Sequence, residues 1–152
     1  MSFKYPALMF SKVTSQSTLL HIIAELSSAD TDTQGASRRI NFFCIPEPDA
    51  NPLSVLAATG EGIIRLWNLR TQNCERTFKG GHNGYIFSMQ VCGAKLVSAA
   101  YEGTVCAWNF ADGNTLWKAP ADGQVFGLAV GDGKVAVGRR DGGIKILGLE
   151  DG

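Results

Sequence analysis

One pattern of hydrophobic and polar positions occurs three times along the chain. Residues 96–109, LVSAAYEGTVCAWN, contain an apolar run, a turn of Tyr, Glu and Gly, and an alternating run that ends in Trp-Asn. Two such runs joined by a short glycine-containing link are typical of a β-hairpin. A matching stretch, VLAATGEGIIRLWN, occupies residues 55–68, and a weaker one, VAVGRRDGGIKILG, occupies residues 135–148. We therefore expect three similar hairpins.

The spacing of these hairpins predicts the fold class. A hairpin that recurs about every 40 residues is typical of the four-stranded blades of a β-propeller, so we expect an all-β chain. The turn signals between the hairpins predict three blades, at residues 38–80, 81–120 and 121–152. The predicted strands of the first blade are 40–45, 53–58, 63–67 and 74–78, and those of the second are 85–91, 95–100, 104–108 and 115–119. The third blade has predicted strands at 125–130, 135–138 and 143–147, without a fourth strand.

Residues 1–37 do not match the repeat. The stretch LLHIIAEL at 19–26 fits a strand or two helical turns, and the propeller context favours a strand. Residues 27–37 are polar and turn-forming, which predicts a loop. A closed propeller has four to eight blades. We therefore expect this chain to be part of a larger or closed ring, with further blades supplied by additional sequence or by another chain.

Charge and cysteine content narrow the class of protein. Fourteen basic and fourteen acidic residues give no net charge, which makes nucleic acid or an anionic membrane surface an improbable partner. The cysteines Cys44, Cys74, Cys92 and Cys106 form no CxxC pair, and each lies in or beside a predicted strand. We expect buried thiols without a metal, and a location in the cytoplasm or nucleus. No stretch has the roughly 20 apolar residues of a membrane span.

The middle repeat resembles the WD40 repeat. Gly81-His82 opens it and Trp108-Asn109 closes its third strand, as Gly-His and Trp-Asp do in that family. The resemblance implies a buried structural tetrad of His82, Ser98, Glu102 and Trp108. The chemistry is consistent, because a buried imidazole needs a carboxylate, a hydroxyl can relay the bond, and an indole N–H needs an acceptor. Glu102 replaces the family's Asp, and its extra methylene changes the reach of the carboxylate.

The other two repeats lack this tetrad. The first has Trp67 but carries Ala57 in place of the serine, and the third carries Val137 and Leu147 in place of the serine and the tryptophan. We expect both to depend on apolar packing.

Catalytic signals are missing from the sequence. His21 and His82 have no catalytic neighbour, and the GDGK stretch at 131–134 lacks the residues of a phosphate-binding loop. We predict no catalytic residue, no metal and no cofactor. The WD40 resemblance implies instead a protein-interaction scaffold, a subunit of a multiprotein complex that binds partner peptides through its rim. The candidate contacts next to the turns are Asn83, Tyr85, Tyr101 and Arg140, with Gly60 at the matching position of the first repeat. Tyr and Arg dominate binding energy at interfaces.

Two alternatives stay open. The segment NTLWKAPADG at 114–123 and the spacing after it resemble quinoprotein-type propeller repeats, which would imply a calcium- and quinone-dependent enzyme or an envelope assembly factor. A subunit of an RNA-processing or RNA-export complex would need a basic rim, for which Arg38-Arg39 and Arg139-Arg140 are the candidates. The Gly-His to Trp-Asn spacing favours the WD40 alternative.

Overall fold

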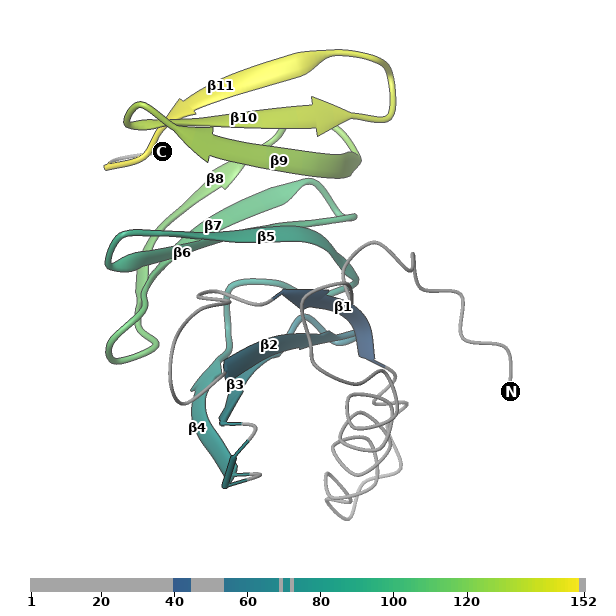
Figure 1. The fold of residues 1–152 in the computed structure, drawn as a ribbon. Helices are drawn as coiled ribbons and strands as arrows, with labels where there is room; N and C mark the ends of the chain where they lie inside the picture. The colour runs from purple at the N-terminus through teal and green to yellow at the C-terminus, as the bar shows by residue number, and fades with distance from the viewer. Residues whose placement is uncertain (1–39, 45–53, 69, 72, 151–152) are drawn as a thin grey trace.

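The chain folds into stacked antiparallel sheets. The computed structural model describes residues 40–44, 54–68, 70–71 and 73–150, with side chains described from residue 54 onward. Within these ranges there are eleven strands in three sheets, which lie one above another (Figure 1). Within each sheet, strands that follow one another in the chain pair side by side, as in a propeller blade. The described residues include no helix with the length and apolarity to cross a membrane.

The strand boundaries are as follows. The first sheet contains β1 (Ile40–Cys44), β2 (Ser54–Thr59), β3 (Ile64–Asn68) and β4 (Asn73–Phe78); the second contains β5 (Ile86–Cys92), β6 (Lys95–Ala100), β7 (Thr104–Asn109) and β8 (Thr115–Pro120); the third contains β9 (Val125–Gly131), β10 (Lys134–Arg139) and β11 (Ile144–Gly148). The predicted strands within the described residues are all confirmed, because each boundary shifts by a residue at most. The predicted strand at 19–26 and the predicted loop at 27–37 lie outside the described residues. The blade limits at residues 80 and 120 stay a prediction.

The core consists of two apolar layers, one on each side of the second sheet. On β6, Leu96 and Ala100 belong to the layer facing the first sheet, while Val97 and Ala99 belong to the layer facing the third. All four are fully buried. A strand that is buried on both faces needs a continuous apolar run rather than an alternating one, which is the pattern of residues 96–100.

The third sheet has an apolar outer face. On β11, Leu147 points into the core, whereas Ile144 and Ile146 on the opposite face are 72% and 56% exposed. Successive side chains of a strand point to opposite faces, so both isoleucines face away from the second sheet.

Candidate functional site

A buried polar network joins the Gly-His turn to the second sheet. Ser98 on β6 and Trp108 on β7 are fully buried, and His82 precedes β5 with only 4% exposed. Trp108 Nε1 donates to Ser98 Oγ at 2.8 Å, and His82 Nε2 lies 2.7 Å from the same oxygen. Three of the four residues implied by the WD40 resemblance therefore meet through one hydroxyl group.

Gly81 allows this arrangement because a side chain would not fit there. A Cβ atom at residue 81 would lie 2.5 Å from Cη2 of Trp108 and 2.9 Å from Sγ of Cys106. The Cys106 thiol also donates to the Gly81 carbonyl at 3.3 Å. The backbone before His82 is thus pressed against the indole, which explains why glycine precedes the histidine.

The fourth residue, Glu102, makes a looser contact. Its Oε1 lies 3.3 Å from His82 Nδ1, and it also accepts from the Asn83 backbone N–H at 3.3 Å. The first contact lacks hydrogen-bond geometry, so His82 Nδ1 is a buried nitrogen with no hydrogen-bond partner among the described residues. We describe it as an electrostatic contact. The longer side chain of Glu places the carboxylate beside Nδ1 without aligning it, as the departure from Asp leads one to expect.

The direction of the hydrogen bonds follows from this carboxylate. Glu102 can only accept when ionised, so the proton of neutral His82 is assigned to Nδ1. Ser98 then donates to His82 Nε2 and accepts from Trp108, which uses both functions of the hydroxyl. The network runs from indole to hydroxyl to imidazole, and its last N–H faces the carboxylate.

Burial keeps the titratable groups of this network uncharged. Removal of His82 from water lowers its pKa from 6.5 to about 4, against the opposing effect of Glu102. Burial likewise raises the pKa of the Cys106 thiol from 9.0 to about 12. At neutral pH the site therefore holds a neutral imidazole and a protonated thiol, neither of which is accessible to solvent.

The cysteines follow the sequence prediction only in part. Cys106 is buried as expected and Cys92 is half-buried, but Cys74 is exposed, so the prediction of a buried thiol is wrong for Cys74. The reason is its position on β4, the outer edge of the first sheet, where the strand is mostly exposed on both faces. The side chain of Cys44 lies outside the described residues. Within the described part of the chain, no group of His, Cys, Asp or Glu side chains could hold a metal ion.

The third sheet replaces the network with apolar side chains. Val137 and Leu147 occupy the strand positions of Ser98 and Trp108, and both belong to the apolar layer between the second and third sheets. Ala57 of the first sheet is also buried. The expectation of apolar packing outside the middle repeat is confirmed for the third sheet.

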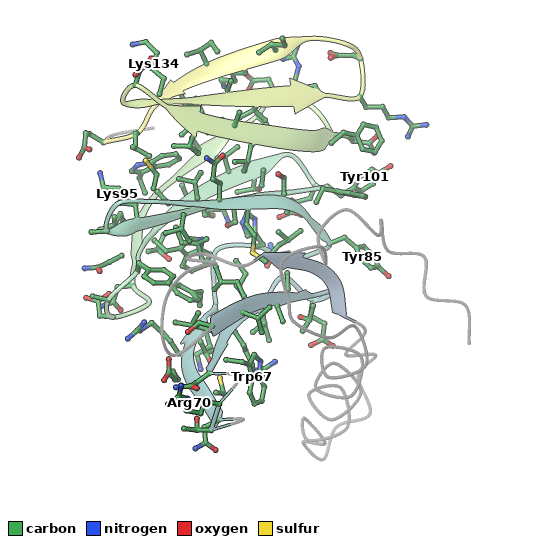
Figure 2. The ribbon with its side chains drawn as sticks, in the orientation of Figure 1. Trp67, Arg70, Tyr85, Lys95, Tyr101 and Lys134 are labelled. Carbon is green, nitrogen blue, oxygen red and sulfur yellow. The ribbon has the colours of Figure 1, made fainter. Side chains whose placement is uncertain are left out.

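The candidate contact residues lie at one end of the sheets. Figure 2 shows Tyr85 and Tyr101 at this end, with Lys95 and Lys134 at the opposite end. Tyr101 and Arg140 meet there, since Arg140 Nη1 donates to Tyr101 Oη at 3.3 Å. Asn83 donates its backbone N–H to Glu102.

Tyr85 lies further along the same end, toward the first sheet. It is 54% exposed and packs against Gly60, where a Cβ would come within 3.0 Å of the ring. A partner-binding role for these rim residues stays a prediction.

Two phenylalanines that sequence reasoning missed complete this end. The rings of Phe87 and Tyr101 are 5.5 Å apart, those of Phe87 and Phe126 are 5.5 Å apart, and those of Tyr101 and Phe126 are 6.4 Å apart. Phe87 is 37% exposed and Phe126 is 52% exposed. Both phenylalanines occupy the same position of the repeat, and this recurrence is the signal by which the sequence could have identified them.

Known proteins with a similar sequence match only part of the chain. The scan against family models found no match. The small ribosomal subunit protein RACK1y of Oryza sativa subsp. japonica is 30% identical over 83 residues, which are 51% of this chain and 24% of that protein. The DDB1- and CUL4-associated factor 13 of Pongo abelii is 30% identical over 67 residues, which are 43% of this chain and 15% of that protein. The matches thus span less than a quarter of the length of either relative.

Solved structures match more of the chain. The β-propeller domain of Myceliophteria thermophila Cps50 (Swd1) aligns with a TM-score of 0.65 at 18% identity, over 78% of this chain and 38% of that one. The WD40 β-propeller domain of Doa1 aligns with a TM-score of 0.63 at 15% identity, over the same shares. The computationally designed Ika4 protein aligns with a TM-score of 0.58 at 24% identity, over 63% of this chain and 60% of that one.

These comparisons agree with the strand pairing and the repeat spacing. Of the two resemblances that the sequence offers, they favour the WD40 repeat over the quinoprotein-type repeat. The described residues have the fold of β-propeller blades, and this fold is similar to that of solved WD40 propeller domains.

Proposed function

We propose that this chain is a non-catalytic protein-interaction scaffold that binds segments of partner proteins at one end of its sheets. This end carries Tyr85, Phe87, Tyr101, Phe126 and Arg140, and we call it the rim surface. The observation that carries the proposal is that exposed aromatic side chains from two sheets meet at this one end. Aromatic residues and arginine are enriched at protein interfaces and supply most of the binding energy there.

The similar proteins support a role in an assembly. One is named as a subunit protein of the ribosome, and the other as a factor associated with two further proteins. Both names describe components of larger complexes, and we extend that role to this chain.

The distribution of reactive groups supports the non-catalytic part of the proposal. The neutral imidazole of His82 and the protonated thiol of Cys106 are both enclosed in the packing of the second sheet. The thiols of Cys74, Cys92 and Cys106 are free, which suits the reducing interior of a cell. An intracellular location is therefore part of the proposal.

The test is a selection from a library of random displayed peptides against the purified chain, followed by hydrogen exchange of the complex. We expect enriched peptides to slow exchange in the backbone around residues 85–87, 101–103, 124–126 and 140. A selection that enriches no peptide, or peptides that protect only the end carrying Lys95 and Lys134, would contradict the proposal.

A further inference from the structure

We propose that the cluster of Phe87, Tyr101 and Phe126, together with Arg140, binds a protein segment that carries an apolar side chain beside a carboxylate. The inference rests on the proposed function and specifies the chemistry of the partner. It uses the side chains of two sheets at once, so it describes a site that neither sheet forms alone.

The two phenylalanines reach the surface because each lies at a β-bulge. Ile86 pairs with Ala100 and Ser88 pairs with Ala99, so Phe87 between them has no partner on β6. Phe126 is skipped in the same way between Val125 and Gly127 in its pairing with β10. A bulge turns the side chain of the extra residue out of the regular alternation. The same irregularity therefore presents a phenylalanine on β5 and on β9.

The three rings form one apolar surface with defined geometry. Phe87 and Phe126 meet edge to face, with an interplanar angle of 74°, and Tyr101 is tilted by 54° and 57° against them. Edge-to-face contacts hold rings in fixed relative positions, which lowers the entropy that a partner must remove on binding. An apolar side chain of a partner can cover the exposed rings and remove them from water.

Arg140 supplies a charge at the edge of this surface. Its Nη1 donates to Tyr101 Oη at 3.3 Å and to Gln124 Oε1 at 3.0 Å, and both of these acceptors are neutral. Its backbone N–H donates to the Gln124 carbonyl at 2.8 Å, so both the backbone and the side chain of Arg140 are hydrogen-bonded to Gln124. The Nε–Nη2 edge of the guanidinium has no hydrogen-bond partner among the described residues.

Two acids near Arg140, Asp141 and Asp122, are already paired with other cations. Asp141 accepts from the Gly143 backbone N–H and, at 3.2 Å, from Arg139 Nε, and these contacts lower the pKa of its carboxyl group. Asp122 pairs with Lys145. Within the described residues Arg140 therefore has no carboxylate, whereas a guanidinium edge matches a carboxylate with two parallel hydrogen bonds. Charge complementarity points to an Asp or Glu next to the apolar residue of the partner.

The test combines the peptide selection with matched variants of the full chain. We expect the enriched peptides to share an Asp or Glu within two residues of an aromatic residue or Leu. Arg140→Gln should raise the Kd of such a peptide at least tenfold, whereas Lys134→Gln, which removes a cation from the same sheet at its opposite end, should leave the Kd unchanged. Phe126→Ala should also weaken binding about tenfold. Leu116→Ala, which removes an exposed apolar side chain from β8, should not.

A change in the peptide keeps the test independent of protein folding. Replacement of the peptide's Asp by Asn, or its Glu by Gln, should raise the Kd for the native chain as much as Arg140→Gln does. The inference is overturned if enriched peptides lack a carboxylate, or if Arg140→Gln and Lys134→Gln act alike; the proposed function then still stands. It is also overturned if the cluster binds an oligonucleotide or a second copy of this chain instead. If no peptide is enriched, both proposals fail.

Discussion

Trp108 and Ser98 are joined by a hydrogen bond of 2.8 Å that lies entirely inside the protein. The indole comes from β7 and the hydroxyl from β6, and the same oxygen contacts the imidazole of His82 from the preceding turn. A single hydroxyl group thus satisfies two buried nitrogens. Ser98 Oγ therefore attaches the turn before β5 to the inner strands β6 and β7 of the second sheet. This turn lies at the end of the sheet that carries the rim surface.

Ser98→Ala should destabilise the fold strongly. The substitution leaves the Trp108 N–H and the His82 Nε2 without a partner, and each unsatisfied buried polar group costs about 1–3 kcal/mol. We expect the free energy of unfolding in urea to fall by about 3 kcal/mol. Ser88→Ala is the matched control, because Ser88 is a half-buried serine on the adjacent strand β5. Equal losses for both variants would show that the shared hydroxyl has no special role.

Gly81→Ala should be destabilising although alanine adds only one methyl group. That methyl group would lie 2.5 Å from the ring of Trp108, which is fully buried and cannot move aside. Overpacking of this kind costs about 1–3 kcal/mol. Gly127→Ala provides the control, since a Cβ at residue 127 meets nothing within 4 Å. Thermal melts of both variants should show a loss only for the first, and a native-like melt of Gly81→Ala would contradict the packing.

Stability should decrease as the pH falls below neutrality because of His82. Its pKa is lowered from 6.5 to about 4 by burial, with Lys118 acting in the same direction and Glu102 opposing. Between these values the unfolded chain binds more protons than the folded one, so the free energy of unfolding falls as pH decreases. The shift corresponds to about 3 kcal/mol at about 1.4 kcal/mol per unit of pKa.

The measurement is urea unfolding at several pH values between 7 and 4. His82→Gln removes the titrating group and should flatten the dependence over this range, apart from the contribution of the remaining residues. A variant with the same slope as the native chain would show that His82 is not the cause.

The strands could be predicted from the sequence because their hydrophobic patterns and turns are local. The run from residue 96 to 100 and the turn before residue 104 fix β6 and β7 without reference to other parts of the chain. The tetrad positions could be found for a similar reason, since Gly81-His82 and Trp108-Asn109 keep the spacing of a known repeat.

The contacts within the aromatic cluster could not be predicted, although the two phenylalanines recur at one repeat position, because these contacts depend on geometry between strands. The alternation of apolar and polar residues along β5 gives no sign of a bulge at Phe87. The bulge is visible only in the pairing of Ile86 and Ser88 with β6. Its contact with Phe126 joins two different sheets. The exposure of Cys74 was missed for a related reason, since it follows from the edge position of β4 and not from the residue type.

Gln90 should contribute to the attachment of the third sheet to the second. Its side-chain amide accepts from the Val130 N–H at 3.0 Å and donates to the Val130 carbonyl at 3.3 Å. Val130 lies on β9, an edge strand of the third sheet, so the amide covers backbone groups that would otherwise lack partners.

Gln90→Ala should therefore lower the free energy of unfolding by about 2 kcal/mol, the cost of two lost hydrogen bonds. Gln90→Glu tests the bond from Gln90 Nε2 to the Val130 carbonyl separately. A carboxylate has no N–H to donate, and one of its oxygens would face the Val130 carbonyl oxygen. Hydrogen exchange at the Val130 amide should become faster in Gln90→Ala, which removes the acceptor of that N–H, and should change less in Gln90→Glu, whose carboxylate can still accept it. An unchanged exchange rate would mean that the contact contributes nothing to the stability of this edge.

The outer face of the third sheet should mediate association of the chain. Ile144 and Ile146 are 72% and 56% exposed on the same face of β11, and adjacent exposed apolar side chains favour burial against another surface. Light scattering at increasing concentration should show a rising average mass for the native chain. The double variant Ile144→Thr with Ile146→Thr should have a lower average mass at the same concentrations. Threonine keeps the β-branched side chain that strands favour. Leu116→Thr, at an exposed apolar position on β8, should associate like the native chain. If the double variant also associates like the native chain, another surface is responsible.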